Sequence, residues 1–344
     1  MKLAVDDIKT IAVFRALQLG DMLCVIPAMR SLRNAYPNAE ITLLGLPWAS
    51  SFVERFHKYF DKFIHFPGYP GLPEQSYNEN NYLKFQQLIK DKHFDLLLQM
   101  QGNGTIVNPL LLSWGAKNVA GFYNDESYVD SDLFIPYPDF GSEISRHLML
   151  MQHLGIPSSG NELEFPLQKK DSIEINNFSA LLFPKRYIIV HPGSRATWRQ
   201  WPPQFFAAVA DYCVEQKFTV VITGTENESE ITKELIKCMH CPAIDLTGKT
   251  SLGGVAALIE DAFMLVANCT GVSHIASALQ TPSIIISMDG EPERWSPINR
   301  SIHKIIDCST HPHFDEVYSA VAMFIKNNMP PSYPDSHTSS KIIS

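Results

Sequence analysis

The sequence has no long apolar run, no excess of positive charge and few cysteines. No segment approaches the ~20 consecutive apolar residues that a membrane-spanning helix needs. The 344 residues carry a net charge of −8, so the surface as a whole does not attract nucleic acid or acidic lipids. Asp6 and Asp7 stand where a signal peptide would have an apolar stretch. These absences predict a cytoplasmic protein that binds no nucleic acid.

Cysteine chemistry is also poorly supported. Six cysteines in a chain of this length do not form a disulfide framework. Cys238 and Cys241 form a single CxxC, and Cys308, His311 and His313 cluster later. A zinc site could be drawn from these residues, but there is no second CxxC and the two groups are far apart in sequence. We therefore expect no bound metal and no redox cofactor.

Two nucleotide-binding motifs are missing as well. The chain contains neither GxGxxG nor GxxxxGK[ST], which disfavours a dehydrogenase and a P-loop kinase. A hydrophobic content of 45% and a charged content of 19% are nevertheless typical of a soluble globular protein. The length suits two α/β domains, each with its own core.

Short apolar runs alternate with amphipathic helical patterns through most of the chain. This rhythm predicts parallel sheets covered by helices on both faces, in two Rossmann-like domains that face a central cleft. The domains are expected at residues 1–170 and 180–310, with 168–179 as the linker, a last helix within 311–327 and a disordered tail over 328–344. Strands are expected at 10–14, 40–44, 62–66 and 95–100, and at 187–190, 218–222, 243–246, 263–267 and 283–286; the helices fall between them, the first at 22–36.

Residues 268–274, Asn-Cys-Thr-Gly-Val-Ser-His, are the most informative segment. They lie between a strand-like run and a helix-like run, so backbone N–H groups at the helix start are available to an anion. Gly271 permits close approach, Thr270 can donate its hydroxyl, and His274 lies one turn further on. The segment is either the diphosphate seat of a nucleotide-linked substrate or an ordinary capped helix start.

Other expected strand ends carry residues suited to the same ligand. Asp21 follows the first strand and could act as a base, although a carboxylate at a helix N-terminus is also stabilising in itself. Ser194, Arg195 and Arg199 follow the first strand of the second half, where arginines bind phosphate oxygens well. Acidic and polar residues follow the next two strands: Glu226 and Glu228 could bind a ribose, and the loop that holds Lys249 and Thr250 could contact a base.

In combination, these motifs resemble family 9 glycosyltransferases, the ADP-heptose:lipopolysaccharide heptosyltransferase group. The resemblance implies a GT-B architecture whose last helix crosses back to the N-terminal acceptor domain, and an inverting, metal-independent transfer. The donor implied is ADP-heptose, and the acceptor is a glycan or glycolipid. The segments that carry the resemblance are 15–27 (RALQLGDMLCVIP), 101–102 (QG), 191–202 (HPGSRATWRQWP), 224–228 (GTENE), 249–255 (KTSLGGV) and 269–276 (CTGVSHIA).

The resemblance also implies roles for single residues. Asp21 matches the general base, Arg199 the cation that stabilises the leaving diphosphate, and Glu228 a ribose ligand. Ser194 matches a phosphate-contacting hydroxyl, and Thr250 a position beside the adenine. Thr270, Gly271 and His274 match the donor-diphosphate loop. In the acceptor domain, Tyr123, Arg146 and His147 are candidate contacts, and a lipid-linked acceptor implies peripheral contact with the inner membrane face.

One departure from the family pattern is Cys269, where the family usually has aspartate. The donor sugar then differs from heptose, or activity is weakened, or Asn268 substitutes for the lost carboxylate. Residues 289–295 also match the usual pattern only in part. Two alternatives therefore stay open: a catalytically degenerate scaffold that binds nucleotide sugar or glycan, and a nucleotide-sugar epimerase on a similar frame.

Overall fold

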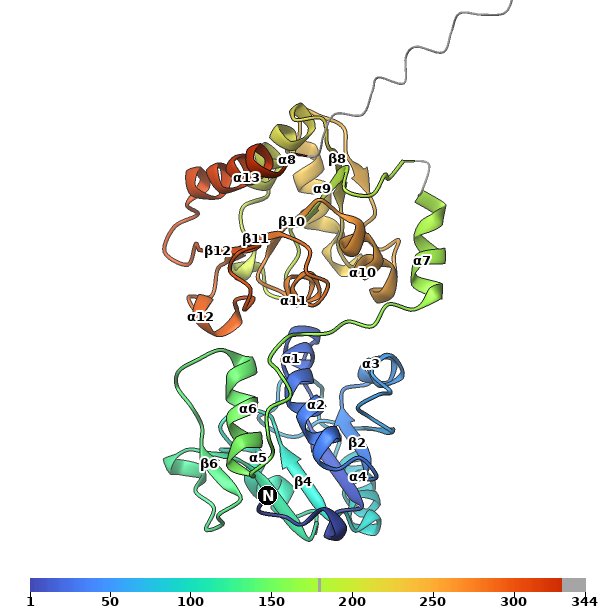
Figure 1. The fold of residues 1–344 in the computed structure, drawn as a ribbon, viewed down its shortest axis with the longest axis vertical. Helices are drawn as coiled ribbons and strands as arrows, with labels where there is room; N and C mark the ends of the chain where they lie inside the picture. Colours follow the sequence, from blue (N-terminus) through green and yellow to red (C-terminus); the bar gives the residue numbers. More distant parts are fainter. Residues whose placement is uncertain (179–180, 330–344) are drawn as a thin grey trace, which may run out of the picture. The chain divides into compact units, whose positions relative to one another are not determined.

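A computed structural model describes residues 1–178 and 181–329, which form two compact units (Figure 1). Unit 1 comprises residues 1–168, 270–280 and 291–299. Unit 2 comprises the other described residues. Two short pieces of the later half thus belong to unit 1, whereas the sequence prediction assigned the whole of 180–310 to a second domain. Both pieces contain a helix that packs against residues of the first half.

Unit 1 is built on a parallel six-stranded sheet in the order β3-β2-β1-β4-β5-β6. The strand β1 (Thr10–Phe14) lies in its interior, paired with β2 and β4, and all of its residues except the first are buried. The other elements of unit 1 are α1 (Leu19–Cys24), α2 (Ile26–Ala35), β2 (Glu40–Gly45), α3 (Ala49–Arg55), β3 (Lys62–His65), α4 (Glu79–Lys92), β4 (Leu96–Gln99), α5 (Val107–Leu112), β5 (Asn118–Tyr123), β6 (Phe134–Pro136), α6 (Glu143–His153), α11 (Gly271–Ala278) and α12 (Pro292–Trp295).

The first helical segment is interrupted, where the sequence predicts one helix over 22–36. The break falls at Val25, between α1 and α2, and Pro27 lies in the first turn of α2. Proline has no N–H to donate to the preceding turn, so the helix stops and starts again. The break leaves α1 as a short helix of six residues directly after β1.

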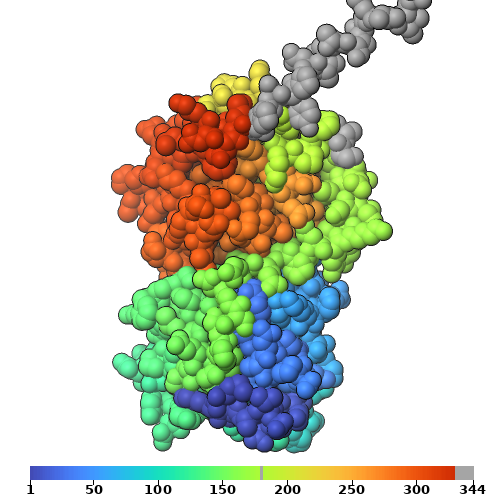
Figure 2. Space-filling model, viewed as in Figure 1, coloured from blue at the N-terminus to red at the C-terminus, as the bar shows by residue number. Residues whose placement is uncertain are grey.

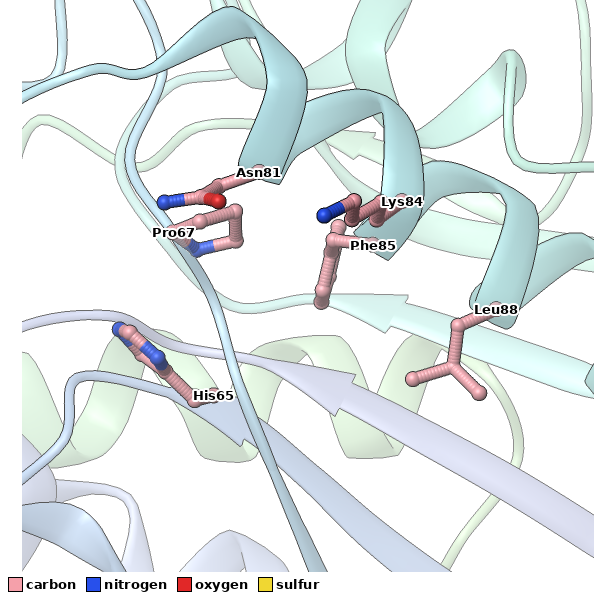
Figure 3. A pocket seen from close by; sticks show the side chains of 6 residues that line it. All are labelled: His65, Pro67, Asn81, Lys84, Phe85 and Leu88. Atoms are coloured by element: carbon pink, nitrogen blue, oxygen red, sulfur yellow. The ribbon is translucent and has the colours of Figure 1, made fainter.

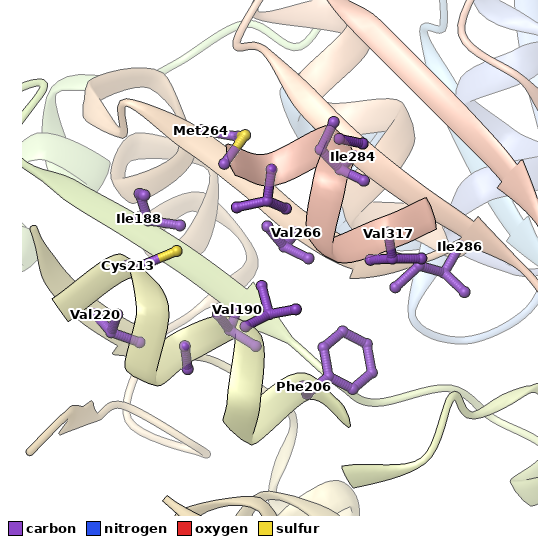
Figure 4. Close-up of a cluster of buried hydrophobic side chains, with 14 of the residues drawn as sticks. Ile188, Val190, Phe206, Cys213, Val220, Met264, Val266, Ile284, Ile286 and Val317 are labelled. Atoms are coloured by element: carbon purple, nitrogen blue, oxygen red, sulfur yellow. The ribbon is translucent and has the colours of Figure 1, made fainter. Parts of the chain in front are cut away.

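Unit 2 contains a second parallel six-stranded sheet, in the order β12-β11-β10-β7-β8-β9. Its core is formed by aliphatic side chains of the central strands, among them Val190, Val266 and Ile286, with Phe206 from a covering helix (Figure 4). The elements are α7 (Lys169–Ile175), β7 (Tyr187–His191), α8 (Pro203–Glu215), β8 (Thr219–Ile222), α9 (Ser229–Cys238), β9 (Ile244–Asp245), α10 (Leu252–Asp261), β10 (Met264–Asn268), β11 (Ser283–Ser287), β12 (His303–Asp307) and α13 (Phe314–Asn328).

The last helix, α13, packs in unit 2, contrary to the expected crossing back to the first domain. Val317, Val321 and Ile325 are buried in the same core cluster as the strands of unit 2. Burying this apolar face holds the helix on its own sheet. The expected linker is also partly helical, because α7 lies within it and packs against α10. The predicted disordered tail falls, from residue 330 on, outside the described residues.

The stretch that follows α6 runs along α2 within unit 1, where it is drawn in light green beside blue (Figure 2). Arg30 of α2 anchors it, donating to the Glu164 carboxylate at 2.6 Å and to the backbone carbonyls of Ser159 and Glu162. Among the helices of the described residues, none is long and apolar enough to cross a membrane.

Candidate active site

Asp21 lies in the first turn of α1, just past the carboxyl end of β1. Its side chain is 25% exposed, so the carboxylate is shielded but accessible. Burial raises the pKa of the Asp21 carboxyl above its ordinary value; the charge of Arg15 opposes this shift, and the charge of Glu143 adds to it. Asp21 is therefore a stronger proton acceptor than an ordinary surface aspartate, as a general base requires.

Arg15, the residue after β1, holds the first turn of α1 in place. Its side chain is fully buried, and its Nε donates to the backbone carbonyl of Asp21 at 2.9 Å. Its Nη1 donates to the carbonyl of Met100, and its Nη2 lies 3.0 Å from Glu143 Oε1 and 3.7 Å from Asp21 Oδ1. The position of Asp21 thus depends on a buried cation.

The start of α11 packs against α1 within unit 1. A methyl group added at Gly271 would lie only 2.8 Å from Leu19 Cδ2, and one added at Gly20 would lie 3.0 Å from His274 Cδ2. The glycines let the two helices approach this closely. The segment that begins with Thr270 and Gly271, both half-buried, therefore lies beside the helix that carries Asp21.

His274 is buried at this contact, with an exposed fraction of 4%. Burial lowers the pKa of its imidazole to about 4, so the ring is neutral at pH 7. Its Nδ1 lies 3.7 Å from the Cys24 thiol, and its ring packs edge-on to Trp295. The sequence analysis assigned His274 to the donor-diphosphate loop, whereas the structure buries its side chain between α11 and α1, where it supports the loop.

In unit 2 the expected donor residues lie on loops at the carboxyl edge of the sheet. Parallel pairing aligns the ends of β7, β8 and β10, with Val190 opposite Ile222 and Ala267 opposite His191. Ser194, on the loop after β7, is buried, and its backbone carbonyl accepts from the Gln200 side chain at 3.0 Å. This register places the loops that follow the three strands at one edge of the sheet.

Glu228 lies across the loop that follows β7. Its carboxylate occupies the space beside Gly193, where an added methyl group would lie 2.2 Å from a carboxylate oxygen. Its Oε2 accepts from the N–H and hydroxyl of Thr225 and lies 3.9 Å from His191 Nε2. Burial lowers the pKa of His191, although the charge of Glu228 acts to raise it. Gly193 is therefore needed to admit the carboxylate.

Arg199 forms an ion pair with Asp289, which follows β11. The arginine side chain is 35% exposed and the aspartate 5%, so the cation is the accessible partner. Ser287 donates to the other oxygen of Asp289 at 2.9 Å. The guanidinium also lies over the Trp198 ring, 5.5 Å from its centroid. Asp289 thus orients Arg199, a partnership the sequence analysis did not identify.

The remaining donor candidates are more exposed. Arg195 and Lys249 lie at the surface, and Lys249 Nζ donates to the backbone carbonyl of Asp245 at 2.6 Å. Thr250 and Cys269 are half-buried. All four lie on loops of unit 2 at the carboxyl edge that carries Ser194 and Glu228.

Asn268 does not substitute for the carboxylate that Cys269 replaces. It is fully buried at the end of β10, where its Oδ1 accepts from the Trp201 N–H at 3.0 Å. Its Nδ2 donates to the carbonyl of Pro192 at 2.6 Å. This side chain is committed to joining the loop after β7 to β10, so that part of the sequence interpretation is wrong.

Two of the three candidate acceptor contacts are buried in unit 1. His147 lies 3.2 Å from Glu143 Oε1, and Arg146 donates to the Tyr137 hydroxyl at 3.2 Å. Tyr123 lies at the end of β5, half-buried. Sequence analysis missed Glu143 because its partners are distant: Arg15 lies 128 positions before it and Arg294 lies 151 positions after it.

A separate pocket of about 280 Å³ opens on unit 1, between the end of β3 and α4 (Figure 3). It is lined by His65, Pro67, Asn81, Lys84, Phe85 and Leu88, none of which the sequence analysis singled out. Within residues 1–178 and 181–329, no group of three or more His, Cys, Asp or Glu side chains is arranged to hold a metal ion.

Comparison with known proteins bears on this site. The sequence model of glycosyltransferase family 9 (heptosyltransferase) matches residues 82–320. The chain is 23% identical over 308 residues to the lipopolysaccharide core heptosyltransferase OpsX of Haemophilus influenzae. That alignment covers 87% of this chain and 84% of the relative.

Solved structures have a similar fold. A family 9 glycosyltransferase of Veillonella parvula superposes with a TM-score of 0.77 at 17% identity, covering 95% of this chain and 100% of that one. The ADP-heptose lipopolysaccharide heptosyltransferase II of Escherichia coli superposes with a TM-score of 0.70 at 18% identity, covering 93% and 99%. With two parallel six-stranded sheets, these likenesses confirm the predicted α/β class and GT-B architecture.

Proposed function

The chain belongs to glycosyltransferase family 9, and from that premise we propose that it transfers heptose from ADP-heptose to a hydroxyl group of a lipopolysaccharide-type acceptor. Glycosyl transfer follows from the family. The sugar and the acceptor are inferred from relatives named for heptose and lipopolysaccharide. The observation that carries the proposal is the packing of α1, which holds Asp21, against the start of α11.

In the proposed reaction, Asp21 accepts the proton of the acceptor hydroxyl. The hydroxyl oxygen then attacks the anomeric carbon of the donor sugar, and a new carbon–oxygen bond forms while the bond to the diphosphate breaks. The bonding electrons leave with the ADP oxygen. A single displacement of this kind inverts the anomeric configuration. The raised pKa of Asp21 supports its role, because a base works best when its pKa lies near the working pH.

Charge on the departing diphosphate is stabilised, in this proposal, by Arg199 and by the start of α11. A guanidinium binds two phosphate oxygens at once, and helix N–H groups favour an anion. Thr270 and Gly271 would supply the N–H groups, supported from below by His274, and Ser194 would supply a hydroxyl. Fixed donors that meet developing charge are a major source of rate enhancement. We expect no divalent ion to be required.

The nucleoside is assigned to the loops after β8 and β9. Glu228 would accept hydrogen bonds from the ribose hydroxyls, and the loop with Thr250 would contact the adenine. Arg195 and Lys249, both exposed, would meet the outer face of the diphosphate or the sugar. We place the reaction in the cytoplasm, with peripheral contact to the inner membrane face if the acceptor is lipid-linked.

The decisive experiment is to incubate the protein with ADP-heptose, other nucleotide sugars and a heptose-deficient lipopolysaccharide, with and without EDTA. We expect heptose on the acceptor and free ADP, unaffected by EDTA. If no nucleotide sugar binds, the proposal is wrong. If ADP and altered sugar appear without acceptor, the protein is instead an epimerase.

A second candidate is a binding scaffold that has lost catalysis, favoured by Cys269 and by the commitment of Asn268 to Trp201 and Pro192. Neither residue then replaces the carboxylate that the family carries in this loop. A scaffold would bind nucleotide sugar but form no product. Product formation by the wild-type protein excludes it.

A further inference from the structure

Glu143 is a buried carboxylate, only 4% exposed, that the proposed reaction does not use. It is the first residue of α6, and it joins three separate parts of unit 1. Its Oε1 lies 3.0 Å from Arg15 Nη2 and 3.2 Å from His147 Nε2, and its Oε2 accepts from Arg294 Nε at 3.0 Å. Every described contact of this carboxylate is thus with a cation or an imidazole.

The Arg15 guanidinium lies closer to the Glu143 carboxylate than to the Asp21 carboxylate. Arg15 Nη2 lies within hydrogen-bond distance of Glu143, but 3.7 Å from Asp21 Oδ1, which is beyond it. A fully buried arginine needs a counter-ion. With Glu143 absent, Asp21 would be the nearest carboxylate, and Arg15 would draw it inward.

Building on the proposed function, we propose that Glu143 is a positioning residue for Asp21: by neutralising Arg15, it keeps the Asp21 carboxylate outside hydrogen-bond distance of that cation and available to the acceptor hydroxyl. Arg294 completes the arrangement by fixing the other oxygen of Glu143, and the Tyr137 hydroxyl in turn accepts from Arg294 Nη2 at 3.1 Å. The segment 291–299, far along the chain, thereby contributes to the setting of the base.

Charged and titratable groups surround Asp21 and Glu143 on the elements packed against them. Arg15 follows β1; Arg146 and His147 lie on α6; Arg294 lies on α12. His274 lies on α11, which packs against α1, and the charge of Glu143 acts on it. Tyr137 precedes α6, and Glu74 accepts from the Gln18 side chain beside α1. Glu74 adds to the raised pKa of Asp21, as Glu143 does. Removing one negative charge from this set must lower the pKa of Asp21, and removing one positive charge must raise it.

The test compares Glu143→Gln with Arg294→Gln by the pH dependence of kcat/KM. We expect the acid limb, which reports the pKa of Asp21 in the free enzyme, to move down by about one pH unit in Glu143→Gln and up in Arg294→Gln. The kcat of Glu143→Gln should fall about tenfold at pH 7, with the KM for ADP-heptose unchanged. Glu143→Asp, which keeps the negative charge, should return the acid limb to its wild-type pH.

The matched control is Glu162→Gln, which removes an exposed carboxylate 3.7 Å from Arg30 elsewhere in unit 1 and should leave the limb in place. If Glu143 had a purely structural role, the acid limbs of Glu143→Gln and Arg294→Gln would shift in the same direction or not at all. Either result overturns the inference. Carbon-13 titration of Asp21 in the same variants reads the shift without substrate. It therefore decides the inference even if wild-type protein transfers no sugar, a result that would defeat only the proposed function.

Discussion

The charges around Asp21 in unit 1 and those around Arg199 in unit 2 are held in different ways. Arg15 and Glu143 are buried and linked through several helices, so Asp21 is set by a rigid network. Arg199 has a single described counter-ion, Asp289, and is 35% exposed on a loop. A proton acceptor needs a fixed environment, since small shifts change its pKa. A phosphate-binding cation needs access to its ligand.

The comparison predicts that Asp21→Ala has the largest effect. It should lower kcat by about 10² to 10⁴-fold, because the proton of the acceptor hydroxyl loses its acceptor. Affinity for ADP should stay within about twofold, a loss too small to reflect a lost hydrogen bond. Kinetics and calorimetry with ADP check both values. Unchanged turnover would show that Asp21 is not the base.

Arg199→Gln should follow, with kcat lowered by about 10² to 10³-fold, since the charge on the leaving diphosphate is no longer stabilised. Arg199→Lys is the matched control and should retain part of the rate, because it keeps the charge without the bidentate geometry. If Arg199→Gln weakened ADP binding while kcat stayed the same, its role would lie in ground-state binding. Arg199 would then differ from Asp21 in that it contributes to ADP binding and not to the chemical step.

Acid should destabilise both units through buried histidines. Burial lowers the pKa of His274 in unit 1 and of His303 in unit 2 to about 4, from 6.5. Between these values the unfolded chain binds more protons than the folded one, so stability is full above pH 6.5 and falls as the pH drops toward 4. Each histidine contributes up to about 3 kcal/mol to this loss. The free energy of unfolding, measured with urea at pH 7 and pH 4.5, gives the size of this loss. His303→Asn should make the difference between the two values smaller.

Glu228→Gln tests the loops of unit 2. We expect about a tenfold weaker affinity for ADP, because a charged acceptor for the ribose hydroxyls becomes neutral. The kcat should be nearly unchanged, in contrast to substitutions around Asp21. Glu230→Gln, on the exposed surface of α9, is the control and should bind ADP normally. Equal affinities for ADP in Glu228→Gln and Glu230→Gln would show that Glu228 does not bind the ribose.

Cys269→Asp should have the smallest effect. If the lost carboxylate oriented the donor, its return should raise kcat/KM by about threefold to tenfold, as expected for one added hydrogen bond. Cys269→Ser controls for the loss of the thiol. A decrease in Cys269→Asp alone would indicate that this chain has adapted its loop to cysteine.

Sequence analysis located the central strands well because buried parallel strands are continuous apolar runs. The strand β1 was predicted at its observed bounds, and the strands of unit 2 were found within one or two residues, apart from β12. The edge strands β6 and β12, and β5 beside β6, were missed because half-exposed strands carry mixed residues. The helix α7 was predicted as linker because its sequence is mostly polar. It is stabilised by a distant contact, in which the Glu174 carboxylate accepts a hydrogen bond from the Ser251 N–H.

Local sequence alone determined the strand–loop–helix units and the residue types at their junctions, because hydrophobic periodicity and turn residues act over a few positions. Asp21, Thr270 and Arg199 could be singled out for that reason. Only the tertiary structure decided that Glu143 and Arg294 meet Arg15, that Asp289 holds Arg199, and that α13 stays on its own sheet. These pairings join residues tens to more than a hundred positions apart, and no local pattern encodes which buried charges neutralise one another.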